Sequence, residues 1–242
     1  MFHPRGPTFL ELARQGLSST RRGYDLLAPK FDLTPFRTPD AILEVVGERL
    51  SRLGPFARGL DLCCGTGAGL RMIQPLCTER VVGLDFSEGM LAQARGRLDP
   101  AARPAVELVQ RDALDLPYAE ELDLVTCFGA LGHIPRAARR SFLAGIFRAL
   151  RPGGLLALVT EAMPPLFSPR WLLGRGYNAV AHLRNLLVRP PFVMLYLTFT
   201  LDEARRLLGE AAFEVQVERA LFAAPYRRGV LLLARRPLLS RR

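Results

Sequence analysis

Three glycines and two acidic residues in the first half of the sequence have the spacing of a nucleotide-binding site. The glycines, Gly65, Gly67 and Gly69, follow an apolar run that predicts a strand and precede a helical pattern. Glycine has no Cβ, so such a loop lets the backbone approach a ligand closely. Asp61 stands at the loop entrance, and Asp85 ends the next predicted strand, where an acid can bind both hydroxyls of a ribose. These residues predict a cofactor that contains adenosine.

The spacing of the glycine loop separates two kinds of adenosine cofactor. The dinucleotide fingerprint is GxGxxG, whereas this chain has GxGxG at 65–69. A pyrophosphate also requires a helix N-terminus without a competing acid, but Asp61 can instead bind the ammonium of a methionine moiety. After the third predicted strand, Asp112-Ala113 would place a further carboxylate beside the adenine amino group. The three acids favour S-adenosylmethionine (SAM) over a nicotinamide dinucleotide.

The elements that must position these residues alternate along the chain. Runs rich in leucine and β-branched residues predict strands at 58–63, 80–85, 106–110, 122–128, 155–160, 215–222 and 230–234. Apolar residues at helical spacing predict helices between them. Thr38-Pro39 is expected to cap one helix, and Thr200 with Glu203 to form a capping box for another. This alternation is typical of a parallel sheet covered on both faces.

We therefore expect an α/β, Rossmann-like fold with a seven-stranded sheet, in which five strand–helix units precede a closing pair of strands. No repeat, low-complexity tract or linker divides the sequence, so residues 1–242 are expected to form a single domain. Residues 1–57 would form an N-terminal helical segment. Residues 162–200 would form a helical cap inserted after the fifth strand.

Five segments resemble the successive motifs of the class I SAM-dependent methyltransferases, in order and at the family's spacing. They are GLDLCCGTGAG (59–69), VVGLDFSEGML (81–91), QRDALDLPY (110–118), FGALGHI (128–134) and LRPGGLLAL (150–158). Tyr24, in YDLLAPKFD, resembles an N-terminal segment of the branch that acts on quinones and other small molecules, where this helix closes over SAM. That branch usually has a second tyrosine where this chain has Phe31.

The resemblance implies which residues would bind SAM. They are Tyr24, Asp61, Cys63, Gly65, Thr66, Gly67, Asp85, Phe86, Met90, Asp112, Ala113, Phe128 and Gly129. Phe86 and Met90 would flank the adenine, and Phe128-Gly129 would line the sulfonium side. Phe86 and Met90 also fit a helix core, because they share helical spacing with Leu91.

Methyl transfer to a small, apolar or aromatic molecule is the activity that the resemblance implies. Displacement at a sulfonium methyl requires alignment and exclusion of water, and it requires a base only if the acceptor must lose a proton. His133 follows the fourth predicted strand, close to where the methyl would point, and is the candidate base. A structural role for His133 stays open, as does the choice between O-, N- and C-methylation.

A nucleic-acid substrate is the first alternative, because the net charge of +10 would suit a polyanion. The basicity comes from arginines spread along the chain, with Lys30 the only lysine. Enzymes that methylate nucleic-acid amino groups have Asp/Asn-Pro-Pro-aromatic after the fourth strand, where this chain has Phe-Gly-Ala-Leu (128–131). The similar MPPLF (163–167) follows the fifth strand. We therefore expect no nucleic-acid partner. A non-catalytic protein that binds SAM is the second alternative.

The cysteines and the ends of the sequence point to a reduced, cytoplasmic protein. Cys63, Cys64, Cys77 and Cys127 show neither CxxC spacing nor a metal-ligand pattern with the three histidines, so we expect buried thiols and no metal. Cys127 also lacks the preceding proline of cytosine C5 methyltransferases. The longest apolar run, 192–201, is about half of a membrane span, and residues 1–16 lack the apolar core of a secretory signal.

The segment 162–200 is longer than the loop this fold needs, and it combines apolar residues with four arginines. We expect it to form a lid over an apolar acceptor site. The apolar surplus also suits contact with a membrane surface, with the arginines on anionic headgroups. A helical cap packed into the core or across a homodimer interface is the alternative.

Overall fold

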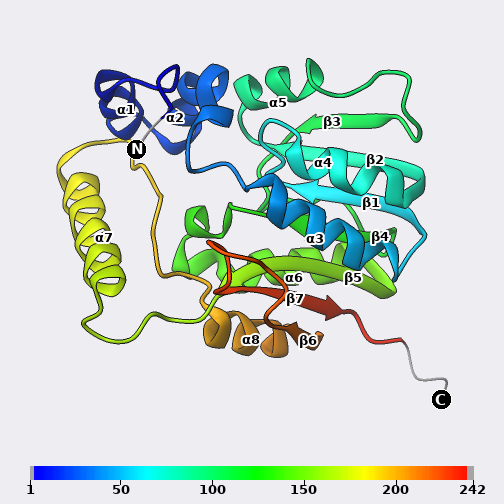
Figure 1. Ribbon diagram of the computed structural model, residues 1–242. Helices are drawn as coiled ribbons and strands as arrows, with labels where there is room; N and C mark the ends of the chain where they lie inside the picture. Colours follow the sequence, from blue (N-terminus) through cyan, green and yellow to red (C-terminus); the bar gives the residue numbers. More distant parts are fainter. Residues whose placement is uncertain (1–2, 239–242) are drawn as a thin grey trace.

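A seven-stranded sheet runs through the computed structural model of the protein, which describes residues 3–238 (Figure 1). Its strands are β1 (Phe56–Leu62), β2 (Cys77–Asp85), β3 (Val106–Gln110), β4 (Leu122–Cys127), β5 (Leu150–Glu161), β6 (Glu214–Glu218) and β7 (Gly229–Arg235). The strand order is β3-β2-β1-β4-β5-β7-β6, and β7 is antiparallel to both neighbours while the other pairs are parallel. The expected Rossmann-like sheet is confirmed.

Helices cover both faces of this sheet. They are α1 (Phe9–Gly16), α2 (Thr20–Leu27), α3 (Asp40–Ser51), α4 (Ala68–Ile73), α5 (Glu88–Arg95), α6 (Arg139–Ala149), α7 (Pro169–Leu187) and α8 (Leu201–Glu210), with short 3-10 turns η1 (Ala28–Leu33), η2 (Gln74–Leu76), η3 (Leu131–His133) and η4 (Arg136–Ala138). Helices α3, α4 and α5 pack on one face, and α6 and α8 pack on the other. Within the described residues, no helix is both long enough and apolar enough to cross a membrane.

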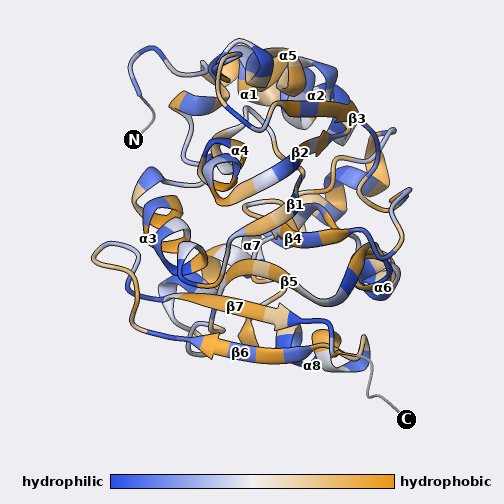
Figure 2. Cartoon of the chain, turned by 90° about the vertical axis from the view of Figure 1, so that its right-hand side faces the viewer, coloured by the Kyte–Doolittle hydropathy of each residue, from blue (hydrophilic) through white to orange (hydrophobic). Residues whose placement is uncertain are grey.

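The alternation of side chains along each strand divides the core into two layers. Leu60 and Leu62 pack with Phe142 of α6 on one face, whereas Val81 packs with Leu70 of α4 on the other, and all five side chains are fully buried. Strands buried on both faces read as continuous apolar runs, as the colouring of β5 and β7 shows (Figure 2). This packing fixes the carboxyl ends of β1, β2 and β4 next to one another.

The number of strand–helix units differs from the expected five, and one expected cap is misplaced. Between β3 and β4 the chain crosses residues 111–121 without a helix, so four strand–helix units precede the closing pair. The expectation for Thr38-Pro39 was also wrong, because α3 begins at Asp40 with Pro39 as the N-cap and has no side-chain cap hydrogen bond.

The expected capping box at α8 is replaced by a tertiary contact. Thr200 is the N-cap residue, but its side chain makes no cap hydrogen bond. Glu203 instead accepts a hydrogen bond from the backbone N–H of Phe199 (2.9 Å) and pairs with the guanidinium of Arg139. Arg139 is only 5% exposed, and a buried guanidinium requires an anionic partner. Glu203 therefore pairs with Arg139 instead of completing the expected capping box with Thr200.

Candidate active site

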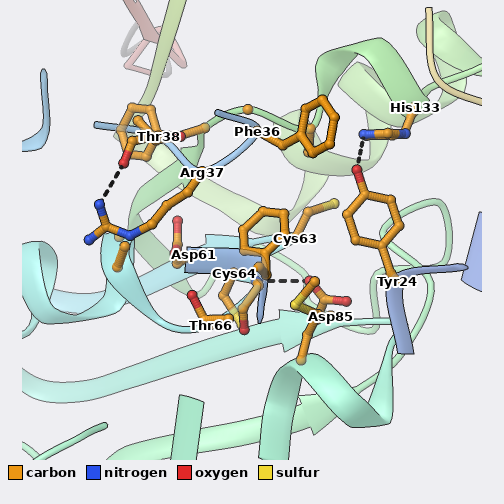
Figure 3. A pocket seen from close by; sticks show the side chains of 18 of the residues that line it. Tyr24, Phe36, Arg37, Thr38, Asp61, Cys63, Cys64, Thr66, Asp85 and His133 are labelled. Carbon is orange, nitrogen blue, oxygen red and sulfur yellow. Dashed lines mark hydrogen bonds between the residues drawn. The ribbon is translucent and has the colours of Figure 1, made fainter. Parts of the chain in front are cut away.

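A cavity, here called the first cavity, opens at the carboxyl ends of β1, β2 and β4 (Figure 3). Sequence analysis had singled out many of its lining residues, namely Tyr24, Asp61, Cys63, Gly65, Thr66, Asp85, Phe86, Met90, Phe128, Gly129 and His133. The sheet, the glycine loop, α2 and α5 each contribute to this lining. Residues more than a hundred positions apart thus meet around one space.

Asp61 lies at the end of β1, and its carboxylate is 3% exposed. Its Oδ1 accepts a hydrogen bond of 2.6 Å from the hydroxyl of Thr126 on β4. A Cβ on Gly69, in the first turn of α4, would overlap this carboxylate, so the helix can approach Asp61 only with glycine there. Burial raises the pKa of Asp61 to about 7, and the charge of Asp85 adds to that rise.

Asp85 ends β2 and is 5% exposed. Its Oδ2 accepts the backbone N–H of Gly65 (2.9 Å) and its Oδ1 accepts that of Ser87 (2.9 Å), so it fixes the glycine loop and starts α5. Burial raises its pKa to about 6, against the lowering effect of those two hydrogen bonds. Each oxygen can still accept a second hydrogen bond.

The two acids have no cationic partner in the described part of the chain. Arg37 also lines the first cavity, but its guanidinium pairs with Asp40 (2.5 Å) and lies 3.7 Å from Asp32. Two buried carboxylates without a counter-ion are costly in an apolar surrounding. A positively charged ligand in the first cavity would offset that cost.

Two acids that were not expected from the sequence attach the N-terminal segment, one to the glycine loop and one to the start of α5. Asp32 of η1 accepts a hydrogen bond of 2.5 Å from the hydroxyl of Thr66 and forms an ion pair of 3.0 Å with Arg97. Asp25 of α2 accepts hydrogen bonds from the hydroxyl of Ser87 (2.6 Å) and the N–H of Gly89 (3.1 Å). Both acids belong to the segment YDLLAPKFD, and that motif was the available signal for them.

Tyr24 and His133 form a hydrogen-bonded pair at the rim of the first cavity. The Tyr24 hydroxyl lies 2.6 Å from Nε2 of His133, and Nδ1 of the same ring lies 2.6 Å from the carbonyl oxygen of Val193 (Figure 3). A carbonyl can only accept, so we assign the proton to Nδ1, and Nε2 accepts from the tyrosine. Burial lowers the pKa of His133 and raises that of Tyr24. The imidazole is therefore a neutral acceptor near pH 7.

A second cavity adjoins the first one and shares Tyr24, Phe36, Gly129 and His133 with it. Its apolar lining includes Ile42, Leu131, Val159, Met194, Leu195 and Leu197, and its polar lining includes Glu161, Arg170, Tyr226 and Arg228. The segment 194–198, which returns from α7, forms one wall and is attached by a hydrogen bond from the N–H of Leu195 to the carbonyl of Gly132 (2.9 Å). Of the expected lid, this return segment and Arg170 line the second cavity.

Three residues implied for cofactor binding lie outside the lining of the first cavity. Gly67 is the left-handed N-cap of α4 (φ 85°) and packs toward Ala94. Asp112 is exposed and accepts a hydrogen bond from the N–H of Leu114 (2.9 Å), and Ala113 is buried in the core. Lining residues that were not expected at the site from the sequence are Phe36, Arg37, Thr38, Leu43, Cys64, Ala68 and Ala130.

The thiols in this region are suited to packing. All four cysteines are unpaired, and Cys64, Cys77 and Cys127 are buried. A hydrogen bond with Cys127 together with burial raises the pKa of the Cys63 thiol, and burial raises that of Cys64. Neither thiol is a thiolate near pH 7. No cluster of three or more candidate metal ligands occurs within residues 3–238.

Known proteins share part of this sequence. Residues 60–154 match the family model described as a methyltransferase domain. Demethylmenaquinone methyltransferase of Lactococcus lactis is 37% identical over 112 residues, which are 44% of this chain and 43% of that protein. The protein of the same name in Listeria welshimeri is 34% identical over 126 residues, 51% of this chain and 52% of its own length. The chain thus spans about half the length of the curated relatives it matches.

Solved structures share the fold around that match. The complex of DhpI with S-adenosylhomocysteine (SAH) has a TM-score of 0.65 at 21% identity and covers 95% of this chain and 99% of its own. Magnesium protoporphyrin IX methyltransferase from Synechocystis with bound SAH has a TM-score of 0.59 at 18% identity and covers 81% and 82%. Residues 60–154 thus match a methyltransferase domain, and the seven-stranded sheet around them has the fold of these SAH-bound structures.

Proposed function

We propose that this protein transfers a methyl group from SAM to a small, largely apolar acceptor. The observation that carries the proposal is the meeting of two cavities at Tyr24 and His133. One cavity holds two buried acids that require a cation, and the other is mostly apolar. A group transfer requires such an arrangement, because donor and acceptor must face each other with water excluded.

The first cavity fits SAM by charge. SAM carries an ammonium and a sulfonium, and either cation would relieve the cost of the buried acids. Asp61 would bind the ammonium of the methionine part, and Asp85 would accept hydrogen bonds from the ribose hydroxyls while it holds the N–H groups of Gly65 and Ser87. Gly69 leaves room for the Asp61 carboxylate. When bound, SAM supplies an electrophilic methyl group.

Tyr24 and His133 can move the proton of the acceptor. Burial lowers the pKa of His133 against the raising effect of its bond to Val193, and that bond orients the ring so that the unprotonated Nε2 can accept a proton. An acceptor hydroxyl in the second cavity would transfer its proton to the Tyr24 oxygen while the tyrosine proton moves to Nε2. In this proposal His133 is the base and Tyr24 the relay, both at the shared wall of the two cavities.

The second cavity suits an acceptor with an apolar body and one polar end. Its apolar wall would contact a ring or an alkyl chain, while the ion pair of Glu161 with Arg170 (3.0 Å) and the exposed Arg228 offer polar contacts. The curated relatives are named demethylmenaquinone methyltransferases, which supports a quinone-like acceptor. Such an acceptor in its reduced form carries a hydroxyl for the proton relay.

Calorimetry of SAM and SAH with the wild-type protein tests the donor half of the proposal, and SAH release with a panel of quinols, phenols, amines and single-stranded RNA tests the acceptor half. We expect binding of both nucleosides and turnover with a quinol or phenol. A folded protein that binds neither nucleoside would overturn the proposal. SAM binding without turnover on any acceptor would favour the non-catalytic alternative, and turnover with RNA alone would favour the nucleic-acid enzyme.

A further inference from the structure

Helix α7 stands at the edge of the molecule, outside the helices that pack on the sheet (Figure 1). Its inner face is attached by side-chain hydrogen bonds. The Asn178 amide pairs with the backbone of Tyr196 (2.7 and 2.8 Å), and the Arg184 guanidinium donates to the carbonyl of Ser18 (2.9 Å). These bonds fix the orientation of the helix, and therefore also the direction of its opposite face.

The opposite face of α7 is an exposed apolar ridge. Leu173, Val180 and Leu187 recur every seven residues, so they lie nearly on one line along the helix, and they are 76%, 68% and 76% exposed. Leu172, Leu183 and Leu186 lie beside that line and are 52%, 56% and 77% exposed. We call these six residues the α7 ridge. Helix α7 has 19 residues and is therefore about 28 Å long, and the α7 ridge runs along most of that length as an apolar strip.

The surroundings of the ridge are cationic. Between residues 162 and 201 the sequence has four arginines and no acid. Arg175, exposed on the edge of the ridge, lies with its guanidinium carbon 5.7 Å from the Trp171 ring centroid, and the exposed Arg189 follows the end of the helix. Helix α1, which lies near the C-terminal end of α7 in Figure 1, adds the exposed Phe9 and Arg14.

We propose that the α7 ridge docks on an anionic phospholipid bilayer and so brings the second cavity to the lipid surface. An amphipathic helix with an apolar face and flanking arginines lies in the headgroup region, with leucines among the acyl chains and guanidinium groups on the phosphates. The idea that the acceptor enters from the bilayer rests on the function proposed above. Docking of the ridge on a bilayer does not depend on that function.

The charge distribution favours a bilayer over a second copy of the chain. A two-fold interface places a surface against itself, so Arg175 and Arg189 beside the ridge would face their own copies, and the segment 162–201 contains no acid to pair with them. A bilayer with anionic headgroups supplies the opposite charge. The ridge also projects from the molecule, and a projecting apolar strip inserts among lipid chains without a matching groove.

The helix is connected to the second cavity by the chain that follows it. Residues 194–198 line that cavity, and Tyr196 among them is bonded to Asn178 of α7. Val193 accepts the hydrogen bond from His133. A bilayer under α7 would therefore lie close to the route by which an apolar acceptor reaches the cavity.

Flotation with phosphatidylcholine vesicles, with and without phosphatidylglycerol, tests the proposal. We expect the wild type to float with the anionic vesicles and much less with the neutral ones. Leu173→Ser, Val180→Ser and Leu187→Ser together should reduce flotation about tenfold or more, because three apolar contacts are lost. Leu114→Ser with Leu238→Ser, two exposed leucines away from the ridge, should leave flotation unchanged.

The charge contribution is tested with Arg175→Gln and Arg189→Gln. This pair should weaken binding to anionic vesicles several-fold, whereas Arg52→Gln with Arg205→Gln, exposed at the end of α3 and on α8, removes the same charge without that effect. Arg184 is left intact because its guanidinium also bonds the carbonyl of Pro190 (2.7 Å) and so holds the structure.

Each variant is also titrated with SAM and analysed by light scattering after gel filtration. Unchanged SAM affinity keeps a docking defect separate from a failure of the proposed function. The proposal is overturned if the wild type does not float with anionic vesicles, or if the serine and control variants float equally. It is also overturned if the wild type is a dimer that the ridge variant converts to a monomer without loss of flotation.

Discussion

The Tyr24 hydroxyl lies 2.6 Å from Nε2 of His133, although 109 positions separate the two residues in the sequence. The contact joins α2, which covers the first cavity, to the turn after β4, which borders the second. The same hydrogen bond therefore attaches the N-terminal segment over the first cavity and positions the candidate base.

Replacing His133 separates a catalytic role from a structural one. His133→Ala should lower turnover about 10²- to 10⁴-fold, the usual contribution of a general base, and weaken SAM binding far less, because Asp61 and Asp85 stay in place. Tyr24→Phe should lower turnover with the same acceptor, because the proton relay is cut. His182→Ala, on the exposed side of α7, is the matched control. If the His133 variant folds like the wild type and turns over normally, His133 has a structural role alone.

Replacing Asp85 tests the ribose site. Asp85→Ala should weaken SAM binding by about 1.5–3 kcal/mol, or about ten- to 150-fold, because charge-assisted hydrogen bonds to the ribose are lost. Calorimetry measures the effect, and a melting curve checks that the loop still folds. Asp123→Asn is the control, since that acid is equally buried but bonds the N–H of Arg58 (2.8 Å) away from the first cavity. Equal affinities for both variants would contradict the assignment.

The pH dependence of SAM binding should reveal the buried acids. Asp61 must be ionised to bind an ammonium, and its pKa of about 7 in the free protein leaves much of it protonated at pH 6. SAM affinity should therefore rise between pH 6 and pH 8, and binding at pH 6 should release protons. Calorimetry in buffers of different ionisation enthalpy measures that release. Asp61→Asn should bind weakly and lose most of the pH dependence, and a wild-type affinity that is flat over this range would count against the assignment.

The same acid should destabilise the ligand-free protein at high pH. The pKa of Asp61 is raised in the folded state above its ordinary value of 3.8, so the protonated folded state is favoured. That stability is fully present below pH 3.8 and is lost as the pH rises through about 7. Asp61→Asn should then melt higher than the wild type at pH 8, by about 2–4 °C for each kcal/mol, and the difference should shrink toward pH 5. A variant that melts lower at pH 8 would refute this account.

Gly69 tests the close approach of α4 to Asp61. Gly69→Ala would push a methyl group into the Asp61 carboxylate, so we expect lower stability and weaker SAM binding together. Gly176→Ala is the matched control within α7, where a Cβ would meet nothing within 4 Å. That control should be stabilised by about 0.5–1 kcal/mol, as alanine is preferred over glycine inside a helix. Urea unfolding of both variants checks the contrast.

The sequence alone determined the elements and much of the first cavity. Runs rich in leucine and β-branched residues identified all seven strands to within a few residues, and the signal is clearest in β4, which is buried on both faces and is apolar at most positions. The structure has a longer β5 and a shorter β6 than the sequence predicts. The ends of these strands depend on pairing with neighbouring strands, and local sequence patterns carry no information on that pairing. Gly65 and Asp85 were also recognisable, because a glycine loop and an acid at strand ends carry local signals.

Only the tertiary structure decided which polar groups pair. Glu203 looked like half of a capping box, yet it compensates the buried Arg139, because an unpaired charge in the core costs more than an open helix cap. Asp112 looked like a third cofactor acid, yet its side chain caps a turn outside the first cavity. Thr126 gave no signal, and it bonds Asp61 only because β4 lies beside β1 in the sheet. Partner choice depends on distances across the fold, and hydrogen bonds and ion pairs act over a few ångströms that sequence spacing does not specify.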